Sequence, residues 1–433
     1  MWTANCVALV AVQAAGASPL SRLHLRLSFL DAVPGAARWD TAYNLSMLRL
    51  VSFGMDVHWA AARAGPASAS LPAPAPLRPS LPLFLAYVLY PPLLIAGPIM
   101  TFADFAAAMG RPLPPRFCRA AAAAPAPSPP NTPPAAAAAP PPPPHVLALR
   151  DAARYAARVV VVWLCLEALT HAIHASAAAS ALRASPSAFP VSPSELGAIA
   201  YWTLLFMWLK FTLVWRFARA WALAAGVNPP ENMLRCVNNN YTVEGFWRGW
   251  HASFNLWLVK YIYVPLGGRN NKLLASWPCF LFVALWHDLA EPRLLFWAAA
   301  CAGGLAPEAA ARALGASRSL FSPKTRSGAA FRHACAAAAA LNISLLMAAN
   351  LGGFVVGPDS LFRLVLGALR TDTTRGPESS GASSSSPSML ASAVGRLAFP
   401  AAAFLCFFSA AHVMFETRAA EARRADLIEL RRH

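Results

Sequence analysis

Hydrophobic residues fill most of this chain in long runs, and polar residues interrupt them at helical spacing. The stretch that begins at Glu244 has this pattern. A helix drawn through it places a polar face and an aromatic face roughly 110° apart. We predict one continuous amphipathic helix that ends at Pro265-Leu266-Gly267-Gly268. Its polar face carries Glu244, Arg248, His251 and Asn255, and its aromatic face carries Trp247, Trp250, Phe254, Trp257 and Tyr261.

A second pattern follows, in which the apolar run from Leu273 to Trp286 closes on His287-Asp288. An ionisable residue in such a position is costly inside a membrane, which favours a functional role. Tryptophan is also common at membrane boundaries, so the pattern alone leaves His287 either functional or merely interfacial. Asp288 either orients the imidazole or caps the next segment.

Further apolar segments predict helices before and after these two patterns. The segment from Asp40 to Ala60 mixes apolar residues with Arg49, Asp56 and His58, which favours an interfacial or protein-buried helix. Leu81 to Met109 is long enough to span a membrane, although Pro91-Pro92 and Gly97-Pro98 interrupt it. In Leu196 to Gly226, Lys210 and Arg216 either snorkel or face a cavity. Further helices are expected at 1–17, 158–175, 293–305, 329–356 and 389–415, the last followed by a charged amphipathic tail.

Two segments have the composition of flexible loops. Residues 111–146 are rich in proline and alanine, and residues 376–388 are rich in serine. Such segments do not bury a core, so they interrupt the fold without dividing it. We expect a single domain over 1–433, with a short and N-terminally truncated beginning.

Composition places the predicted helices in a membrane. Hydrophobic residues make up 57% of the chain and charged residues 13%, against about 25% charged in soluble domains. The fold class predicted is therefore all-α, a polytopic bundle of about eight to ten transmembrane helices. The net charge of +17 is typical of basic loops that face the cytosol and anionic head groups. No nucleic-acid-binding module accompanies it, so a nucleic-acid partner is not expected.

Several kinds of chemistry lack a motif. The eight cysteines are scattered and have no C-x-x-C pair, so they are expected to pack rather than bind metal. His251 and His287 are too far apart in sequence to match a metal-ligand motif, and no metal site is predicted. No H-E-x-x-H, Walker or G-x-S-x-G pattern occurs, which leaves metal-dependent, nucleotide and serine-esterase hydrolysis without support.

The motifs in these segments resemble the membrane-bound O-acyltransferase family, and within it the glycerol-uptake branch related to hedgehog acyltransferase. The resemblance covers about 41–108 and 195–300. It rests on motifs in a fixed order, which begin at Tyr43, Tyr90, Glu231, Phe246, Tyr261 and Phe282 and include Phe-Trp-Arg-Gly-Trp-His and Ala-Leu-Trp-His-Asp. It implies a helical bundle around a tunnel for acyl donor and acceptor, with His287 as the catalytic histidine and His251 as a second site.

The resemblance and the chemistry together suggest a mechanism. A neutral histidine serves as general base, and His287 is given that role. No nucleophile motif lies beside it, so the acceptor is expected to attack acyl-CoA directly, with no cofactor. His251 and Asn255 hold the carbonyl or the acceptor. Trp286 and Asp288 are further positioning candidates, and Arg248 and Lys260 are candidates for the CoA phosphates.

The acceptor remains open between a lysophospholipid, such as a lyso GPI-anchor lipid, and a protein N-terminus. The resemblance suits a lipid acceptor and a multi-pass location in the endoplasmic reticulum membrane. A glycerol transporter and a regulatory homologue are the alternatives. A transporter is typically built from repeated halves, and no repeat is detected here. A regulator typically lacks the histidine, and His287 is present.

Overall fold

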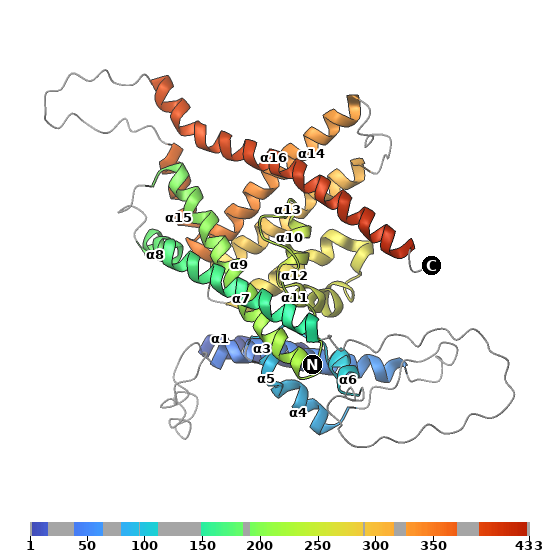
Figure 1. The fold of residues 1–433 in the computed structure, drawn as a ribbon. Coiled ribbons are helices and arrows are strands. Elements are labelled where there is room, and N and C mark those ends of the chain that lie inside the picture. Colours follow the sequence, from blue (N-terminus) through green and yellow to red (C-terminus); the bar gives the residue numbers. More distant parts are fainter. Residues whose placement is uncertain are drawn as a thin grey trace.

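The protein is built from helices, as its computed structural model shows (Figure 1). Within the described residues there is no strand, only an isolated bridge between Met233 and Trp250. The all-α prediction is confirmed, and ten of the described helices have ten or more residues. The structure describes residues 2–15, 39–63, 79–94, 96–110, 149–184, 191–288, 291–315, 326–369 and 389–430. The predicted loops 111–146 and 376–388 lie outside these ranges.

Two helices lie side by side in the lower part of Figure 1, above α4 (Leu81–Leu89): α1 (Trp2–Ala15) and α3 (Trp39–Arg63). Of the two alternatives for α3, interfacial or protein-buried, the structure favours the second at Arg49 and Asp56, which point into protein, whereas His58 is exposed. Arg49 donates to the carbonyl of Val88 at 2.6 Å, and Asp56 is 5% exposed. Hydrogen bonding to protein satisfies groups that would be costly in lipid.

The segment from Leu81 to Met109 does not form one spanning helix, because it breaks at the two places that the sequence analysis named. Tyr90 precedes a proline and has an extended backbone, which ends α4, and Pro91 starts a new short helix. The freed backbone N–H groups of Ile99 and Phe102 are taken up by the hydroxyls of Ser253 and Ser52. The breaks therefore dock this segment against its neighbours. It consists of α4 (Leu81–Leu89), α5 (Pro91–Leu94) and α6 (Phe102–Met109).

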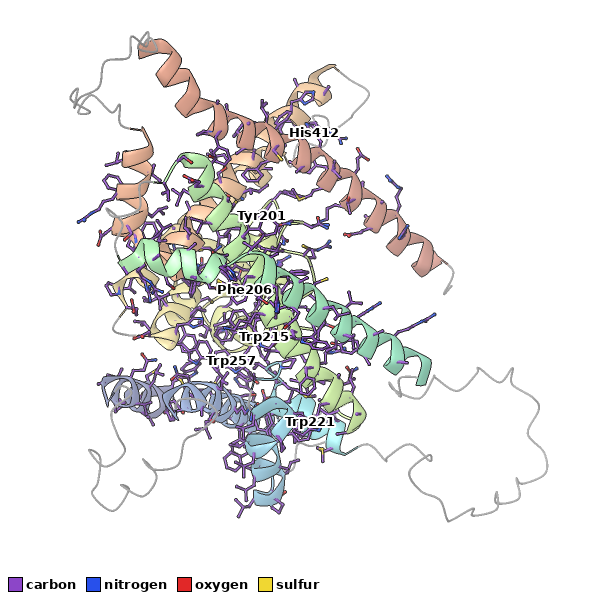
Figure 2. The ribbon with its side chains drawn as sticks, turned by 60° about the vertical axis from the view of Figure 1, so that its left-hand side comes forward. Tyr201, Phe206, Trp215, Trp221, Trp257 and His412 are labelled. Atoms are coloured by element: carbon purple, nitrogen blue, oxygen red, sulfur yellow. The ribbon has the colours of Figure 1, made fainter. Side chains whose placement is uncertain are left out.

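The longest helix in the centre of the molecule is α9, Pro193–Ala224. It starts at a capping box, in which Ser192 accepts from the Glu195 N–H and Glu195 accepts from the Ser192 N–H. It packs along α7 (Leu149–Ala172) and against α8 (Ala175–Ala184). Figure 2 shows Tyr201, Phe206, Trp215 and Trp221 at successive levels along α9.

The remaining helices form the rest of the bundle, where α12 packs on α13 and α16 crosses α14 at the top of Figure 1. The predicted last span and its charged tail form one helix, α16. Four helical stretches are long and apolar enough to cross a membrane: 153–172, 194–224, 328–355 and 398–424. The bounds are α12 (Lys272–His287), α13 (Pro292–Gly315), α14 (Arg326–Asn350), η7 (Leu351–Val355), α15 (Pro358–Leu369) and α16 (Met389–Leu430).

Candidate active site

The predicted continuous helix from Glu244 is wrong, because the chain breaks in its middle. Helix α10 (Val243–Gly249) ends at Trp250, whose backbone is extended, and His251 follows with φ of +47°. Helix α11 (Ala252–Leu258) then begins and continues into a π-helical turn, η4 (Val259–Tyr263). The turn at residues 264–267 ends the unit where the sequence predicted.

Asn232 holds this break in place. The Leu234 N–H donates to the Gly249 carbonyl at 3.0 Å, and the Ala252 N–H donates to the Asn232 carbonyl at 2.9 Å. The side chain of Asn232 is fully buried and accepts from both the N–H and the hydroxyl of Ser253. These bonds give the backbone groups near His251 partners outside a helix. The sequence pattern missed Asn232, and Gly249 was the one local hint of a helix end.

His251 lies among aromatic rings. Its imidazole stacks on Trp215 with ring centroids 4.4 Å apart, and Phe254 is 5.1 Å away. The ring makes no hydrogen bond to a described residue. Burial among these rings lowers the pKa of His251, and His287 acts in the same direction. The imidazole is therefore neutral at pH 7.

His287 is the last residue of α12, as the apolar run predicted. The Asp288 N–H closes the helix on the Ala284 carbonyl at 3.2 Å, and the Asp288 backbone is then extended. The His287 ring lies edge-on to Trp286 and Phe354 and makes no hydrogen bond to a described residue. Within the described part of the chain, its ring nitrogens are therefore available to a substrate.

Trp286 is fixed by the N-terminal helices. Its indole N–H donates to the Asn44 carbonyl at 2.9 Å, and the Asn44 amide donates to the Trp286 carbonyl at 2.8 Å. Gln13 donates to the same Trp286 carbonyl at 3.1 Å. Helices α1 and α3 therefore hold the end of α12 that carries His287.

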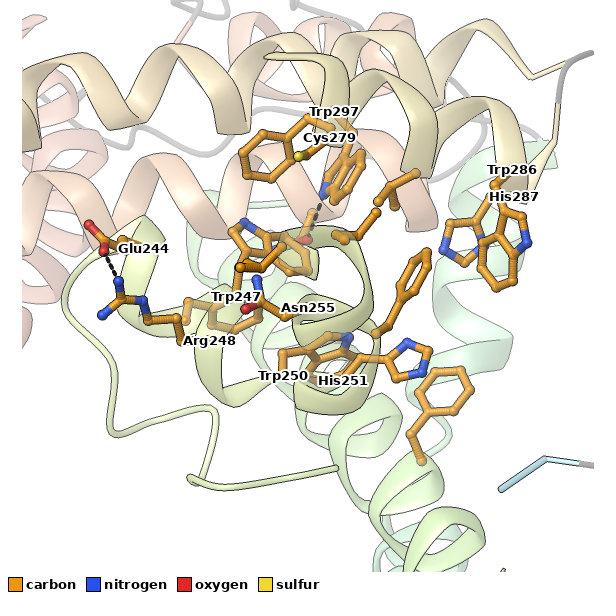
Figure 3. A pocket seen from close by; sticks show the side chains of 18 of the residues that line it. Glu244, Trp247, Arg248, Trp250, His251, Asn255, Cys279, Trp286, His287 and Trp297 are labelled. Carbon is orange, nitrogen blue, oxygen red and sulfur yellow. Dashed lines mark hydrogen bonds and ion pairs between the residues drawn. The ribbon is translucent and has the colours of Figure 1, made fainter. Parts of the chain in front are cut away.

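A chain of aromatic rings connects the two histidines. Phe254, beside His251, lies 4.8 Å from Trp286 between ring centroids, and Trp286 lies 4.8 Å from His287. Figure 3 shows the two imidazoles on different elements at one side of a common cavity. The break in the α10–α11 unit and the end of α12 thus bring together residues 36 positions apart.

The wall beside His287 depends on a close approach of two backbones. A Cβ at Gly353 of η7 would lie 2.5 Å from the Cβ of Trp297, so this contact requires glycine. The Trp297 indole N–H donates to the Asn350 side chain at 3.2 Å. The approach places Phe354 next to His287.

Both histidines line one cavity of about 1320 Å³. This exceeds the range of roughly 300–1,000 Å³ that is common for small-molecule sites. Apolar and aromatic side chains form most of the lining. Among the lining residues described, the charged ones are Lys210, Glu244, Arg248 and Lys272.

The other predicted site residues divide between the cavity and its surroundings. Asn255 lines the cavity, and its side chain makes no hydrogen bond to a described residue. Arg248 also lines it and pairs with Glu244 at 2.6 Å. Lys260 is not among the described lining residues and pairs with Asp56 at 2.8 Å. Asp288 lies just beyond the lining, at the end of α12.

The described residues contain no group of three or more histidine, cysteine, aspartate or glutamate side chains able to hold a metal ion. The fold and site thus define a polytopic helical membrane protein with two histidines lining one mostly apolar cavity. The profile of MBOAT, the membrane-bound O-acyltransferase family, matches residues 32–350. The chain belongs to this family, which confirms the resemblance seen in its motifs.

The chain is similar to several curated proteins, among them two that are named membrane-bound O-acyltransferases. Membrane-bound O-acyltransferase GUP1 of Saccharomyces cerevisiae is 34% identical over 347 residues, which is 76% of this chain and 54% of that protein. The gup1 protein of Schizosaccharomyces pombe is 31% identical over 93% of this chain and 61% of its own length. Protein-cysteine N-palmitoyltransferase HHAT of Mus musculus is 27% identical over 54% of this chain and 41% of that protein. The chain thus spans about half to three fifths of the GUP1 relatives.

Proposed function

We propose that this protein transfers a fatty acyl group from acyl-CoA to a hydroxyl group of a lipid. One observation carries the proposal. Two imidazoles, neither hydrogen-bonded to a described residue, line a single large cavity in a membrane protein of the O-acyltransferase family. Family membership indicates the reaction class, and the available ring nitrogens supply the acid–base groups that it needs.

In the proposed reaction, His287 removes the proton from the acceptor hydroxyl as that oxygen attacks the thioester carbonyl. The carbonyl carbon becomes tetrahedral, and its oxygen carries the negative charge. The intermediate collapses with loss of CoA thiolate, which takes the proton back from His287. The products are an ester and CoA, and no acyl-enzyme forms.

Asn255 supports the negative charge on the carbonyl oxygen. Its amide faces the cavity from α11 without a described partner, so it is able to donate to the oxyanion. His251, one turn earlier in sequence, provides a second polar group at the same wall. Removing one oxyanion donor typically lowers turnover by about 10²–10³-fold.

The cavity suits a long apolar donor whose distal end is charged. Aromatic and aliphatic side chains fill most of its wall, and each buried CH₂ of an acyl chain contributes about 0.8 kcal/mol. Arg248 and Lys272 flank Glu244 in the lining and form the proposed site for CoA phosphates. Arg248 makes the shorter of the two ion pairs, at 2.6 Å.

The acceptor we propose is a lysophospholipid, with a lyso GPI-anchor lipid as one member of that class, in the endoplasmic reticulum membrane. The two GUP1 relatives are named as O-acyltransferases, which favours an oxygen acceptor. HHAT, named as an N-palmitoyltransferase of protein cysteine, matches at lower identity over a shorter region. A protein acceptor is therefore the second candidate.

The test compares purified wild type with His287→Ala, using labelled acyl-CoA and a lysophospholipid. We expect a loss of at least about a hundredfold in turnover, because proton abstraction is removed. His171→Ala is the matched control, since His171 lies exposed on α7 away from the cavity, and its activity should equal wild type. Equal rates for wild type and His287→Ala would refute the mechanism.

Two further outcomes separate the alternatives. Label that appears only on a peptide N-terminus, and never on lipid, would replace the lipid acceptor with a protein acceptor. Glycerol uptake into proteoliposomes by both forms, with no acylated product, would support transport instead of acyl transfer.

A further inference from the structure

Lys210 lies at the centre of the longest candidate membrane helix in the described structure. The span 194–224 of α9 places 16 residues before it and 14 after it. Figure 2 shows α9 running through the molecule, with Phe206 and Trp215 between the outer levels of Tyr201 and Trp221. An ionisable residue in the middle of a membrane span is a candidate functional residue, and the Lys210 side chain is exposed rather than buried in protein.

The Lys210 side chain faces the same cavity as the two histidines. The α9 residues in the lining repeat every three or four positions, which defines one face of the helix. This answers the question that the sequence left open, since Lys210 faces the cavity rather than lipid. That face consists of Leu204, Met207, Lys210, Phe211, Val214 and Trp215.

Lys210 differs from its cationic neighbours in having no counter-charge among the described residues. Arg216, two turns further along α9, pairs with Glu231 at 3.5 Å. Arg248 and Lys272 share Glu244. Lys210 has no hydrogen bond or ion pair with a described residue. It lies only near two aromatic faces, 6.0 Å from Phe206 and 5.8 Å from Phe211.

Aromatic faces stabilise a lysine by about 0.5–2 kcal/mol, but they do not balance its charge. An anion that enters the cavity would supply the missing counter-charge. Lys210 is five residues from Trp215, or about 7.5 Å of helix rise. Trp215 stacks on His251. An anion at Lys210 therefore lies within a short distance of the proposed reaction centre.

The two substrates differ in the number of phosphate charges that they carry, and this difference indicates which of them binds at Lys210. CoA carries several phosphate charges, which suit a group of cations such as Arg248 and Lys272. A phosphodiester head group carries a single charge, which suits a single lysine. Arg248 and Lys272 thus form one anion site in the cavity and Lys210 forms a second, so that each substrate has its own.

We propose that Lys210 binds the phosphate of the lysophospholipid acceptor and thereby presents the acceptor hydroxyl to His287. This inference rests on the proposed function and specifies its acceptor as a phosphate-bearing lipid. Lys210 is then a specificity-determining residue, because a neutral monoacylglycerol has no phosphate group for it to bind.

The test measures the kinetics of purified wild type, Lys210→Gln and Lys210→Arg with lysophosphatidylinositol and with monoacylglycerol. For Lys210→Gln, we expect the KM for lysophosphatidylinositol to rise at least about tenfold, because a charge-assisted hydrogen bond is lost. The KM for acyl-CoA and the kinetics with monoacylglycerol should stay at wild-type values. Lys210→Arg keeps the charge and should restore most of the affinity.

Two kinetic results would overturn the inference. A rise in the KM for acyl-CoA alone would place Lys210 at the donor. Equal losses with the phosphate-bearing and the neutral acceptor would make it a structural residue.

A binding measurement separates this inference from the proposed function. Labelled lysophosphatidylinositol is titrated against wild type and Lys210→Gln without acyl-CoA. Weaker binding to Lys210→Gln supports the phosphate site even where wild type shows no acyl transfer, and in that case the proposed reaction alone fails. Equal binding to both forms, or no binding to either, overturns the inference.

Discussion

The ring of Trp215 stacks on the imidazole of His251, with centroids 4.4 Å apart and planes inclined by 22°. Trp215 belongs to α9, whereas His251 sits in the break between α10 and α11. The position of α9 therefore helps to set the position of the His251 imidazole in the site. Because the His251 imidazole makes no hydrogen bond to a described residue, ring contacts restrict its orientation.

We predict that Trp215→Leu lowers turnover more than it lowers stability. Leucine still fills apolar volume but loses the stacked face, so the imidazole samples other rotamers. Turnover should fall about tenfold, which corresponds to about 1.4 kcal/mol, close to the upper estimate for an aromatic pair. Trp215→Phe keeps a stacking face and serves as the control in the same assay. Equal losses for the leucine and phenylalanine variants would contradict the role of stacking.

The backbone at His251 gives a second prediction. Its φ of +47° lies in the left-handed region, which costs most L-residues about 1–2 kcal/mol but is more accessible to asparagine. His251→Ala and His251→Asn should lose similar turnover, since both lack the ring. Thermal unfolding of the purified proteins should show His251→Ala as the less stable of the two. A lower unfolding temperature for His251→Asn would show that backbone strain is not the deciding effect.

Asn232 should behave as a positioning residue. Asn232→Ala removes the acceptor for two donors of Ser253, and an unmet buried donor costs about 1–3 kcal/mol. We expect a lower unfolding temperature together with reduced turnover at unchanged KM for acyl-CoA. Asn228→Ala is the control, because Asn228 bonds Arg219 at the surface of the same loop. Wild-type turnover in Asn232→Ala would show that the hydrogen bonds of Asn232 are not needed to position His251.

Lys260 and Arg248 should respond differently, although the sequence proposed both for CoA phosphates. Lys260 and the Tyr261 hydroxyl both contact Oδ1 of the buried Asp56 carboxylate. Lys260→Met should therefore lower the free energy of unfolding by about 2 kcal/mol, the loss expected for a charged hydrogen bond. Arg248→Met should instead raise the KM for acyl-CoA and leave stability nearly unchanged, since its guanidinium is largely exposed.

Activity assays with acyl-CoA and chemical denaturation in detergent distinguish these two effects. If Lys260→Met raised the KM for acyl-CoA at full stability, the sequence-based assignment of Lys260 to CoA would regain support. If Arg248→Met left that KM unchanged, the proposed phosphate site would be wrong.

The local pattern of apolar and polar residues predicted the helix end at His287 correctly. His287 was found because an apolar run ends at a polar residue, and that helix end is a local property of the sequence. The break before His251 was missed because it is held by Asn232, which lies 19 residues earlier and leaves no periodic signal. The ion pair of Lys260 was missed for the same reason, since its partner Asp56 is on a distant helix.

The family resemblance supplied what periodicity did not. It assigned both His251 and His287 to the site, although the spacing between them matches no motif. It did not reveal Lys210, because a lysine in an apolar helix has two orientations that local sequence does not separate. Only the packing of α9 beside the cavity decides between them.

The reciprocal hydrogen bonds between Asn44 and Trp286 join positions 242 residues apart, and Gln13 reaches the same carbonyl from 273 residues away. During synthesis, α1 and α3 therefore leave the ribosome long before α12 exists. Asp56 of α3 likewise lacks Lys260 and Tyr261 as partners until residue 261 has been made. The cavity wall that carries His287 is thus completed late in synthesis, because the bonds that hold Trp286 form only after α12 has been made.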